Sequence, residues 1–80
     1  MDNYNLKMNQ DSPKYLQIYN HIKKMIIEDN IKASTKLPPI RKIAKLLGVN
    51  NTTIVKAYEL LEKEGYVYKT VGSGTFVSDK

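Results

Sequence analysis

Hydrophobic residues recur at helical spacing in three stretches of this chain. The first stretch runs from Lys14 to about Asp29, after a proline at position 13 that suits the first turn of a helix. Its apolar stripe consists of Tyr15, Ile18, Tyr19, Ile22, Met25, Ile26 and Ile27. This spacing is typical of an amphipathic helix, which we expect to support the rest of the fold.

The second stretch is shorter and follows a pair of prolines. Leu37 is expected to anchor a very short strand, and Pro38 and Pro39 should fix the start of the helix. The apolar residues at positions i, i+3, i+4 and i+7 are Ile40, Ile43, Ala44 and Leu47. Gly48 can adopt the left-handed conformation that ends a helix, so we expect about two helical turns here.

The third stretch begins directly after a tight turn. Val49 is expected to fill this turn with an apolar side chain, and Asn50 is a good N-cap residue. The helix should span residues 51–64 and end at Gly65. Its buried stripe would comprise Ile54, Ala57, Tyr58 and Leu61. Two helices joined by such a turn have the outline of a helix-turn-helix.

Two segments rich in aromatic and β-branched residues complete the pattern. Tyr66–Thr70 and Thr75–Val77 flank a glycine-containing turn, which predicts a hairpin. The expected fold is mainly α with a small β-hairpin, a winged helix-turn-helix of three helices plus a wing over residues 13–80. Residues 1–12 are polar and lack periodicity, so we expect a flexible N-terminal arm there.

Composition limits the other classes of protein that fit. Eighty residues make one small domain. The absence of cysteine excludes disulfides and thiolate metal sites, and the single histidine, His21, is expected to face solvent. No apolar run approaches the roughly 20 residues of a membrane span, and the first residues do not resemble a secretory signal. We therefore expect a cytoplasmic protein without a membrane partner.

Positive charge is concentrated in the middle of the chain, which has a net charge of +5. No acidic residue occurs between Asn30 and Tyr58. The basic residues of this window are Lys32, Lys36, Arg41, Lys42, Lys45 and Lys56. Such a distribution favours one positive face able to bind phosphates, although an ordinary solvated lysine face explains the charge alone equally well.

The start of the third helix carries an unusual outer face. Thr52 and Thr53 are poor helix formers, so their presence indicates either capping or contact with a DNA groove by short side chains. The preceding helix and turn favour groove contact. The side chains predicted to face base edges are Asn51, Thr52, Val55 and Lys56.

Phosphate contacts are expected on either side of that face. The candidate residues are Arg41, Lys42, Lys45, Lys56 and Lys69. The hairpin tip, Gly72-Ser73-Gly74, is small enough to enter a minor groove or to lie along phosphates, although glycines at a tip are also ordinary turn residues.

These residues together resemble the N-terminal DNA-binding domain of the GntR family of bacterial transcription regulators. The resemblance covers about Pro13 to Val77. Its most specific segments are Leu37–Arg41, Ile43-Ala44 with Leu47–Val49, Thr52-Thr53 with Ala57-Tyr58, and Glu62–Tyr66 leading into Gly72–Val77. Within the family the chain is most similar to the MocR branch, and the YtrA branch is a close rival.

The resemblance implies roles for individual residues. Arg41 would contact a phosphate or a base edge, Thr52 and Thr53 would lie near the backbone and bases, and Gly72–Gly74 would form the wing tip. Asn51 stands where many relatives have arginine, Val55 stands where one large branch of the family has arginine, and Ser34 replaces a usual glycine. Asparagine pairs well with adenine and valine can touch a thymine methyl, so our hypothesis is an A·T-leaning half-site.

The family resemblance also implies partners. The expected partner is double-stranded DNA, in a palindromic operator bound by a homodimer of the full-length protein. Dimerisation depends largely on an effector domain that is absent from this chain, so we expect the chain alone to be monomeric or weakly dimeric. No cofactor is expected here, whereas a MocR-type protein would bind pyridoxal phosphate in its C-terminal domain.

A second interpretation is a winged helix that serves as a protein-interaction or architectural module, because fold does not fix function. Its candidate contacts are Leu46 and Leu60. An enzyme is not expected, since the sequence lacks paired acids, a nucleophile with a base, or a metal-ligand cluster.

Overall fold

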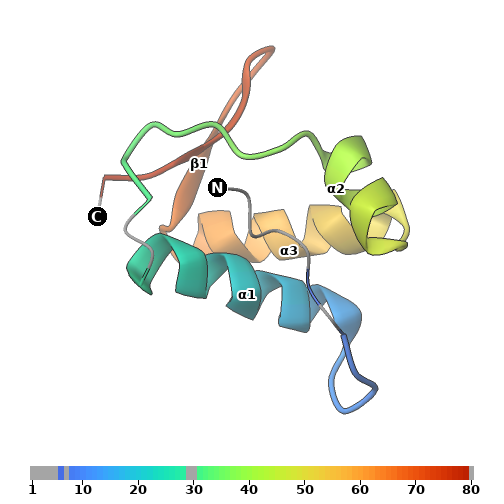
Figure 1. Ribbon diagram of the computed structural model, residues 1–80. Helices are drawn as coiled ribbons and strands as arrows, with labels where there is room; N and C mark the ends of the chain where they lie inside the picture. The colour runs from blue at the N-terminus through green and yellow to red at the C-terminus, as the bar shows by residue number, and fades with distance from the viewer. Residues whose placement is uncertain (1–5, 7, 29–30, 80) are drawn as a thin grey trace.

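The computed structural model describes residues 6, 8–28 and 31–79. Three helices and a two-stranded hairpin follow one another, as predicted (Figure 1). They are α1 (Lys14–Glu28), α2 (Ile40–Leu47), α3 (Asn51–Lys63), β1 (Val67–Thr70) and β2 (Gly74–Val77). The expected end of the first helix near Asp29 falls outside the described residues. None of the described helices combines the length and the apolar content that a membrane crossing requires.

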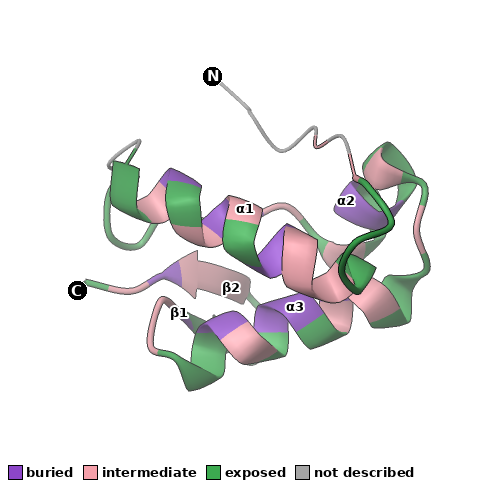
Figure 2. Cartoon of the chain, turned by 90° about the horizontal axis from the view of Figure 1, so that it is seen from below, coloured by how far each residue is buried: buried purple, intermediate pink, exposed green. Residues whose placement is uncertain are grey.

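The hydrophobic core lies between α1 and α3, which run side by side in Figures 1 and 2. Ile22, Ile54 and Leu61 are completely buried, so the predicted stripes of both helices do form the core. The remaining core residues are Ile18, Tyr19, Met25, Leu37, Ile43, Ala44, Ala57, Tyr58, Val67 and Val77. The expectation for Ile27 was wrong: this residue is 55% exposed, since it lies on the outer side of α1, one residue beyond the half-buried Ile26.

The turn between α2 and α3 depends on one left-handed residue. Gly48 has φ 69°, and the N–H of Val49 donates to the carbonyl of Ala44 at 3.0 Å, which closes the end of α2. Asn50 occupies the N-cap position of α3, as predicted, but its side chain makes no capping hydrogen bond. The backbone geometry of the turn therefore sets the start of α3.

The wing is held on both edges of its second strand. β1 pairs antiparallel with β2, with Val67 opposite Val77 and Thr70 opposite Gly74. On the other edge of β2, residues 34–37 run alongside it: the N–H of Ser34 donates to the carbonyl of Val77 at 2.7 Å, and that of Leu37 donates to the carbonyl of Thr75 at 2.8 Å. We call residues 31–39, between α1 and α2, the connector.

The short strand predicted at Leu37 is present as a single bridge one residue earlier, between Lys36 and Phe76. Leu37 itself is 1% exposed and anchors the connector in the core. The hydroxyl of Tyr58 on α3 donates to the carbonyl of Pro38 at 2.8 Å. The connector is thus attached both to the wing and to α3.

The end of the predicted N-terminal arm contacts α1. Gln17 accepts a hydrogen bond from the N–H of Asn9 at 3.0 Å and donates to the carbonyls of Asn9 and Ser12. Leu6 and Met8 are half-buried against the core. Residues 9–12 are exposed and form a loop that projects beyond the start of α1 (Figure 1), and Gln17 holds this loop to the helix. The prediction of a flexible arm for residues 1–5 and 7 lies outside the described residues.

Candidate nucleic-acid interface

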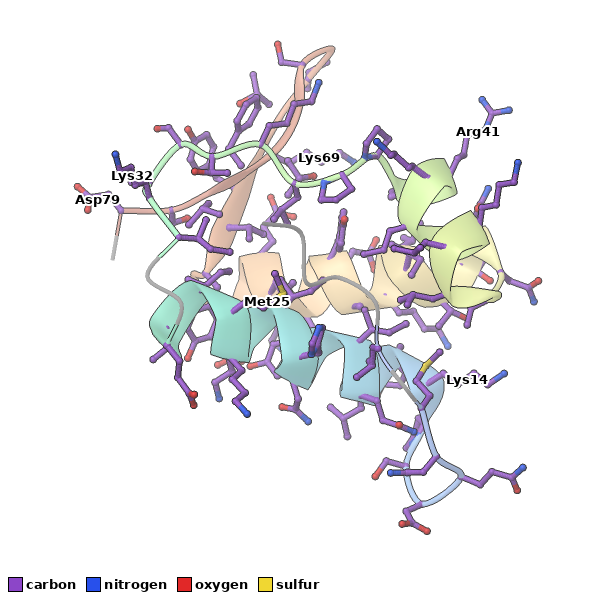
Figure 3. The ribbon with its side chains drawn as sticks, viewed as in Figure 1. Lys14, Met25, Lys32, Arg41, Lys69 and Asp79 are labelled. Atoms are coloured by element: carbon purple, nitrogen blue, oxygen red, sulfur yellow. The ribbon has the colours of Figure 1, made fainter. Side chains whose placement is uncertain are left out.

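Three cations occupy the outer side of α2. Arg41, Lys42 and Lys45 are all exposed, while Ile43 and Ala44 on the opposite side of the helix are buried. Figure 3 shows Arg41 reaching outward from the start of this helix. The amphipathic pattern of α2 therefore presents its cations to solvent, next to the turn that leads into α3.

The first turn of α3 presents short, uncharged side chains. Asn51 and Thr52 are exposed, whereas Thr53 and Val55 are half-buried. Because this part of the helix is open, Asn51 and Thr52 are accessible to a ligand as predicted. Thr53 lies closer to the protein interior, so less of its side chain is accessible.

The side chains predicted to face base edges lie on two different sides of α3. Thr52 and Lys56 lie on the side of α1, where they line a small hollow of about 130 Å³ together with Lys14 and Tyr15. The ammonium of Lys56 lies 5.7 Å from the centre of the Tyr15 ring, within cation–π range. The contact with Tyr15 of α1 therefore orients the Lys56 side chain. This contact cannot be predicted from the spacing of residues along α3.

Val55 lies on the other side of the helix, toward the wing. It lines a hollow of about 140 Å³ with residues of α2 and of the hairpin, including Ile40 and Lys69. Glu59 and Glu62, further along α3, line the same hollow and are exposed. Their negative charge disfavours an anion at this part of the helix, whereas the first turn of α3 contains no acidic residue.

A larger groove of about 480 Å³ separates the wing from the connector. Gly72 and Ser73 are exposed at its tip, Gly74 is half-buried, and Lys69 is exposed on β1. The residues that line the groove are Lys36–Ile40, Tyr58 and Lys69–Thr75. The wing residues predicted from the sequence are therefore brought together at one opening.

Two residues of this region were not among the predicted site residues. Lys36 lines the groove from the connector, and Val71, next to the tip, is 95% exposed. The acid-free window of the sequence contained Lys36, but its position outside any helix or hairpin gave no reason to place it beside the wing. The available signal for Val71 was its place directly before Gly72 in the predicted turn.

Other predicted features differ from the structure. Leu60, a proposed contact for a protein partner, is half-buried against the core because it faces α1, and Leu46 alone is largely exposed at 55%. His21 is half-buried rather than fully exposed to solvent. Within the described part of the chain, His, Asp and Glu form no cluster of three or more that could hold a metal ion.

Comparison with known sequences places this arrangement among regulators. Residues 14–77 match the family described as "Bacterial regulatory proteins, gntR family". The chain is 38% identical over 73 residues to the probable rhizopine catabolism regulatory protein MocR of Rhizobium meliloti, covering 91% of this chain and 15% of that protein. It is 35% identical over 68 residues to the transcriptional repressor YtrA of Bacillus subtilis, covering 85% of this chain and 52% of that repressor.

Solved structures agree with the sequence comparison. YtrA from Sulfolobus acidocaldarius, a GntR-family transcription factor, superposes with a TM-score of 0.84 at 32% identity, over 96% of this chain and 81% of that one. The DNA-binding domain of AraR, in complex with operator ORE1, superposes with a TM-score of 0.80 at 33% identity, over 91% and 89% of the two chains. The likeness confirms the predicted winged helix-turn-helix.

Proposed function

The chain belongs to the GntR family of bacterial regulatory proteins, and from this premise we propose that it binds operator DNA on behalf of a transcription regulator. The matched relatives are transcription regulators, in agreement with the prediction that the chain is not an enzyme. The similarity to the AraR domain, whose structure contains operator DNA, supports DNA as the ligand.

The observation that carries the proposal is the exposed, uncharged start of α3 beside the three cations of α2. A helix with this surface fits the major groove, where Asn51 and Val55 would meet base edges. Arg41, Lys42 and Lys45 would bind phosphates of the flanking strand. Thr52, Thr53 and Lys56, on the side of α1, would bind the backbone and the adjacent base edges.

The wing would make the second contact. Its tip, Gly72-Ser73-Gly74, carries almost no side-chain bulk and is exposed at residues 72 and 73. The tip would lie in the minor groove or along the backbone, with Lys69 on a phosphate. The acidic residues of α3, Glu59 and Glu62, keep the DNA near the start of the helix.

The salt dependence of binding tests the proposed phosphate contacts. If Arg41, Lys42, Lys45, Lys56 and Lys69 each neutralise one phosphate, the logarithm of the binding constant should fall with the logarithm of salt at a slope of about −4.5, and more steeply if a further cation also binds a phosphate. Fluorescence anisotropy of a labelled mixed-sequence duplex measures this slope. A binding constant that does not change with salt would refute the proposed DNA contacts.

Asn51 tests how sequence is read. Asn51→Ala should weaken binding most on duplexes with an A·T pair at the position that Asn51 meets, by about 1–3 kcal/mol for a lost bidentate contact. Duplexes varied at single positions reveal this preference. Asn20→Ala, an exposed asparagine on α1, is the matched control and should bind as the wild type does. Equal weakening by Asn51→Ala on all duplexes would exclude an A·T-reading role.

Specific regulation requires a second half-site. We propose that the full-length cytoplasmic regulator is a homodimer on a palindromic operator, because one winged helix covers only a single half-site. The chain spans 15% of the MocR relative and 52% of the YtrA relative, so a further region would supply most dimer contacts.

We place no cofactor on this domain; pyridoxal phosphate would belong to a C-terminal domain of the MocR type. Analytical ultracentrifugation should show this chain as a monomer or a weak dimer.

The protein-interaction alternative has less support. Of its two candidate residues, Leu60 packs against the core and only Leu46 is largely exposed. A single exposed leucine is ordinary on a protein surface. The three exposed cations of α2, by contrast, form a surface that suits a negatively charged ligand.

A further inference from the structure

The side chain of Lys36 lies over Gly74 of the wing. A methyl carbon placed on Gly74 would lie 2.8 Å from Cε of Lys36 and 3.7 Å from its Nζ. Gly74 also has φ 125°, a conformation that side chains rarely adopt. The stem of Lys36 therefore crosses the wing at the one place where the strand has no side chain.

The backbone of Lys36 is fixed where the side chain leaves it. Lys36 forms a bridge with Phe76, and the N–H of the next residue, Leu37, donates to Thr75. Leu37 is anchored in the core at 1% exposure. With its backbone held and its stem lying over Gly74, Lys36 has its charged end beside the wing, where a ligand can reach it.

The surroundings of this ammonium are suited to an anion. The groove between wing and connector has two charged side chains in its lining, Lys36 and Lys69, and both are cations. The acidic residues of α3 line the neighbouring hollow instead. Residues 72 and 73 of the wing tip are exposed at the open end of the groove, so a strand that follows the wing passes close to both lysines.

We propose that Lys36 binds a phosphate of the DNA strand that runs along the wing, and that Gly74 acts as a positioning residue by leaving space for the Lys36 side chain. This inference rests on the proposed DNA-binding function and adds the connector to the DNA-binding surface. Gly74, which the family resemblance placed at the wing tip, would then act through Lys36 as well as through the turn.

The test compares two lysines of the same connector. Lys36→Met keeps the stem and removes the charge. Lys32→Met is the matched control, because Lys32 is exposed and lies far from Arg41 in Figure 3. Binding of a mixed-sequence duplex about two helical turns long is measured over a series of salt concentrations. Lys36→Met should make the slope shallower by about one and weaken binding several-fold at low salt, with Lys32→Met unchanged.

The outcomes separate this inference from the function on which it rests. If the wild type binds duplex DNA and Lys36→Met has the same salt-dependence slope as the wild type, the role of Lys36 is overturned and the proposed function stays intact. Failure of the wild type to bind duplex DNA overturns the proposed function and this inference with it. Circular dichroism confirms that each variant is folded.

Gly74 is tested in combination with Lys36. Gly74→Ala should weaken DNA binding several-fold when Lys36 is present and have little further effect on binding in the Lys36→Ala background. Any strain at φ 125° is common to both backgrounds, so it cancels in this comparison. Equal weakening in both backgrounds would show that Gly74 acts independently of Lys36.

Discussion

Among single residues, positions 34 and 48 share a positive φ but carry different residues. Both have φ 69°, in the left-handed region. At Gly48 this conformation ends α2 without strain, and a Cβ there would meet nothing within 4 Å. At Ser34 the same conformation is strained for a residue with a side chain. Its hydroxyl lies 3.3 Å from that of Tyr68, an exposed hydrogen bond that offsets little of this cost.

Exchanging the residue types at these positions should change stability in opposite directions. Ser34→Gly should raise the free energy of unfolding by about 0.5–1 kcal/mol, because relief of strain exceeds the added entropy of the unfolded chain. Gly48→Ser should lower it by a similar amount. Urea unfolding measures both, and Ser34→Ala, which keeps the Cβ, is the control that should not gain stability. A stabilising Gly48→Ser would contradict this explanation.

At the scale of elements, α3 has a neutral start followed by acidic residues. Glu59 lines the hollow beside Val55, so its charge faces the same approach as the reading residues. Glu59→Gln should therefore strengthen binding to a mixed-sequence duplex by about two- to threefold at low salt, and less at high salt. Glu28→Gln, an exposed acid at the end of α1, is the control and should have a smaller effect. Weaker binding by Glu59→Gln would show that Glu59 supports the site.

The helices were predictable because each has one buried side. The 3.6-residue period fixes which residues face the core, so the sequence pattern by itself identifies Ile54, Ala57 and Leu61 as buried. The period is less informative at the edges of the stripe. Ile27 lies at the edge of the stripe of α1, and Leu60 lies at the edge of the stripe of α3. Both are large apolar residues, and only the position of the neighbouring helix decides that Leu60 is partly covered while Ile27 is exposed.

The candidate site was predictable in part for the same reason. The exposed cations of α2 follow from the amphipathic pattern of that helix. The position of Lys36 over Gly74 depends on a pairing between residues distant in sequence, and local pattern contains no information on it. The contact between Lys56 and Tyr15 likewise requires the packing of α1 against α3.

At the scale of the whole molecule, the core and the DNA-binding surface use separate sets of residues. Among the residues that the structure describes, the buried set is entirely apolar apart from the tyrosine hydroxyls, and the proposed contacts are exposed or half-buried. Asn51 is exposed and contributes little to packing, so another residue can replace it without loss of the fold. The scaffold therefore follows the family, whereas the sequence that is read depends on this chain.

The pairing of the connector with β2 also has a consequence for the order of folding. Leu37 and Thr75 lie on either side of α2 and α3 in the sequence, so closing this loop costs entropy that the local helices do not incur. We expect α2 and α3 to form first and the wing to be completed last. In pulsed hydrogen exchange during refolding, the amides of α3 should be protected before those of Leu37 and Val77. Simultaneous protection would instead indicate that the wing belongs to the folding nucleus.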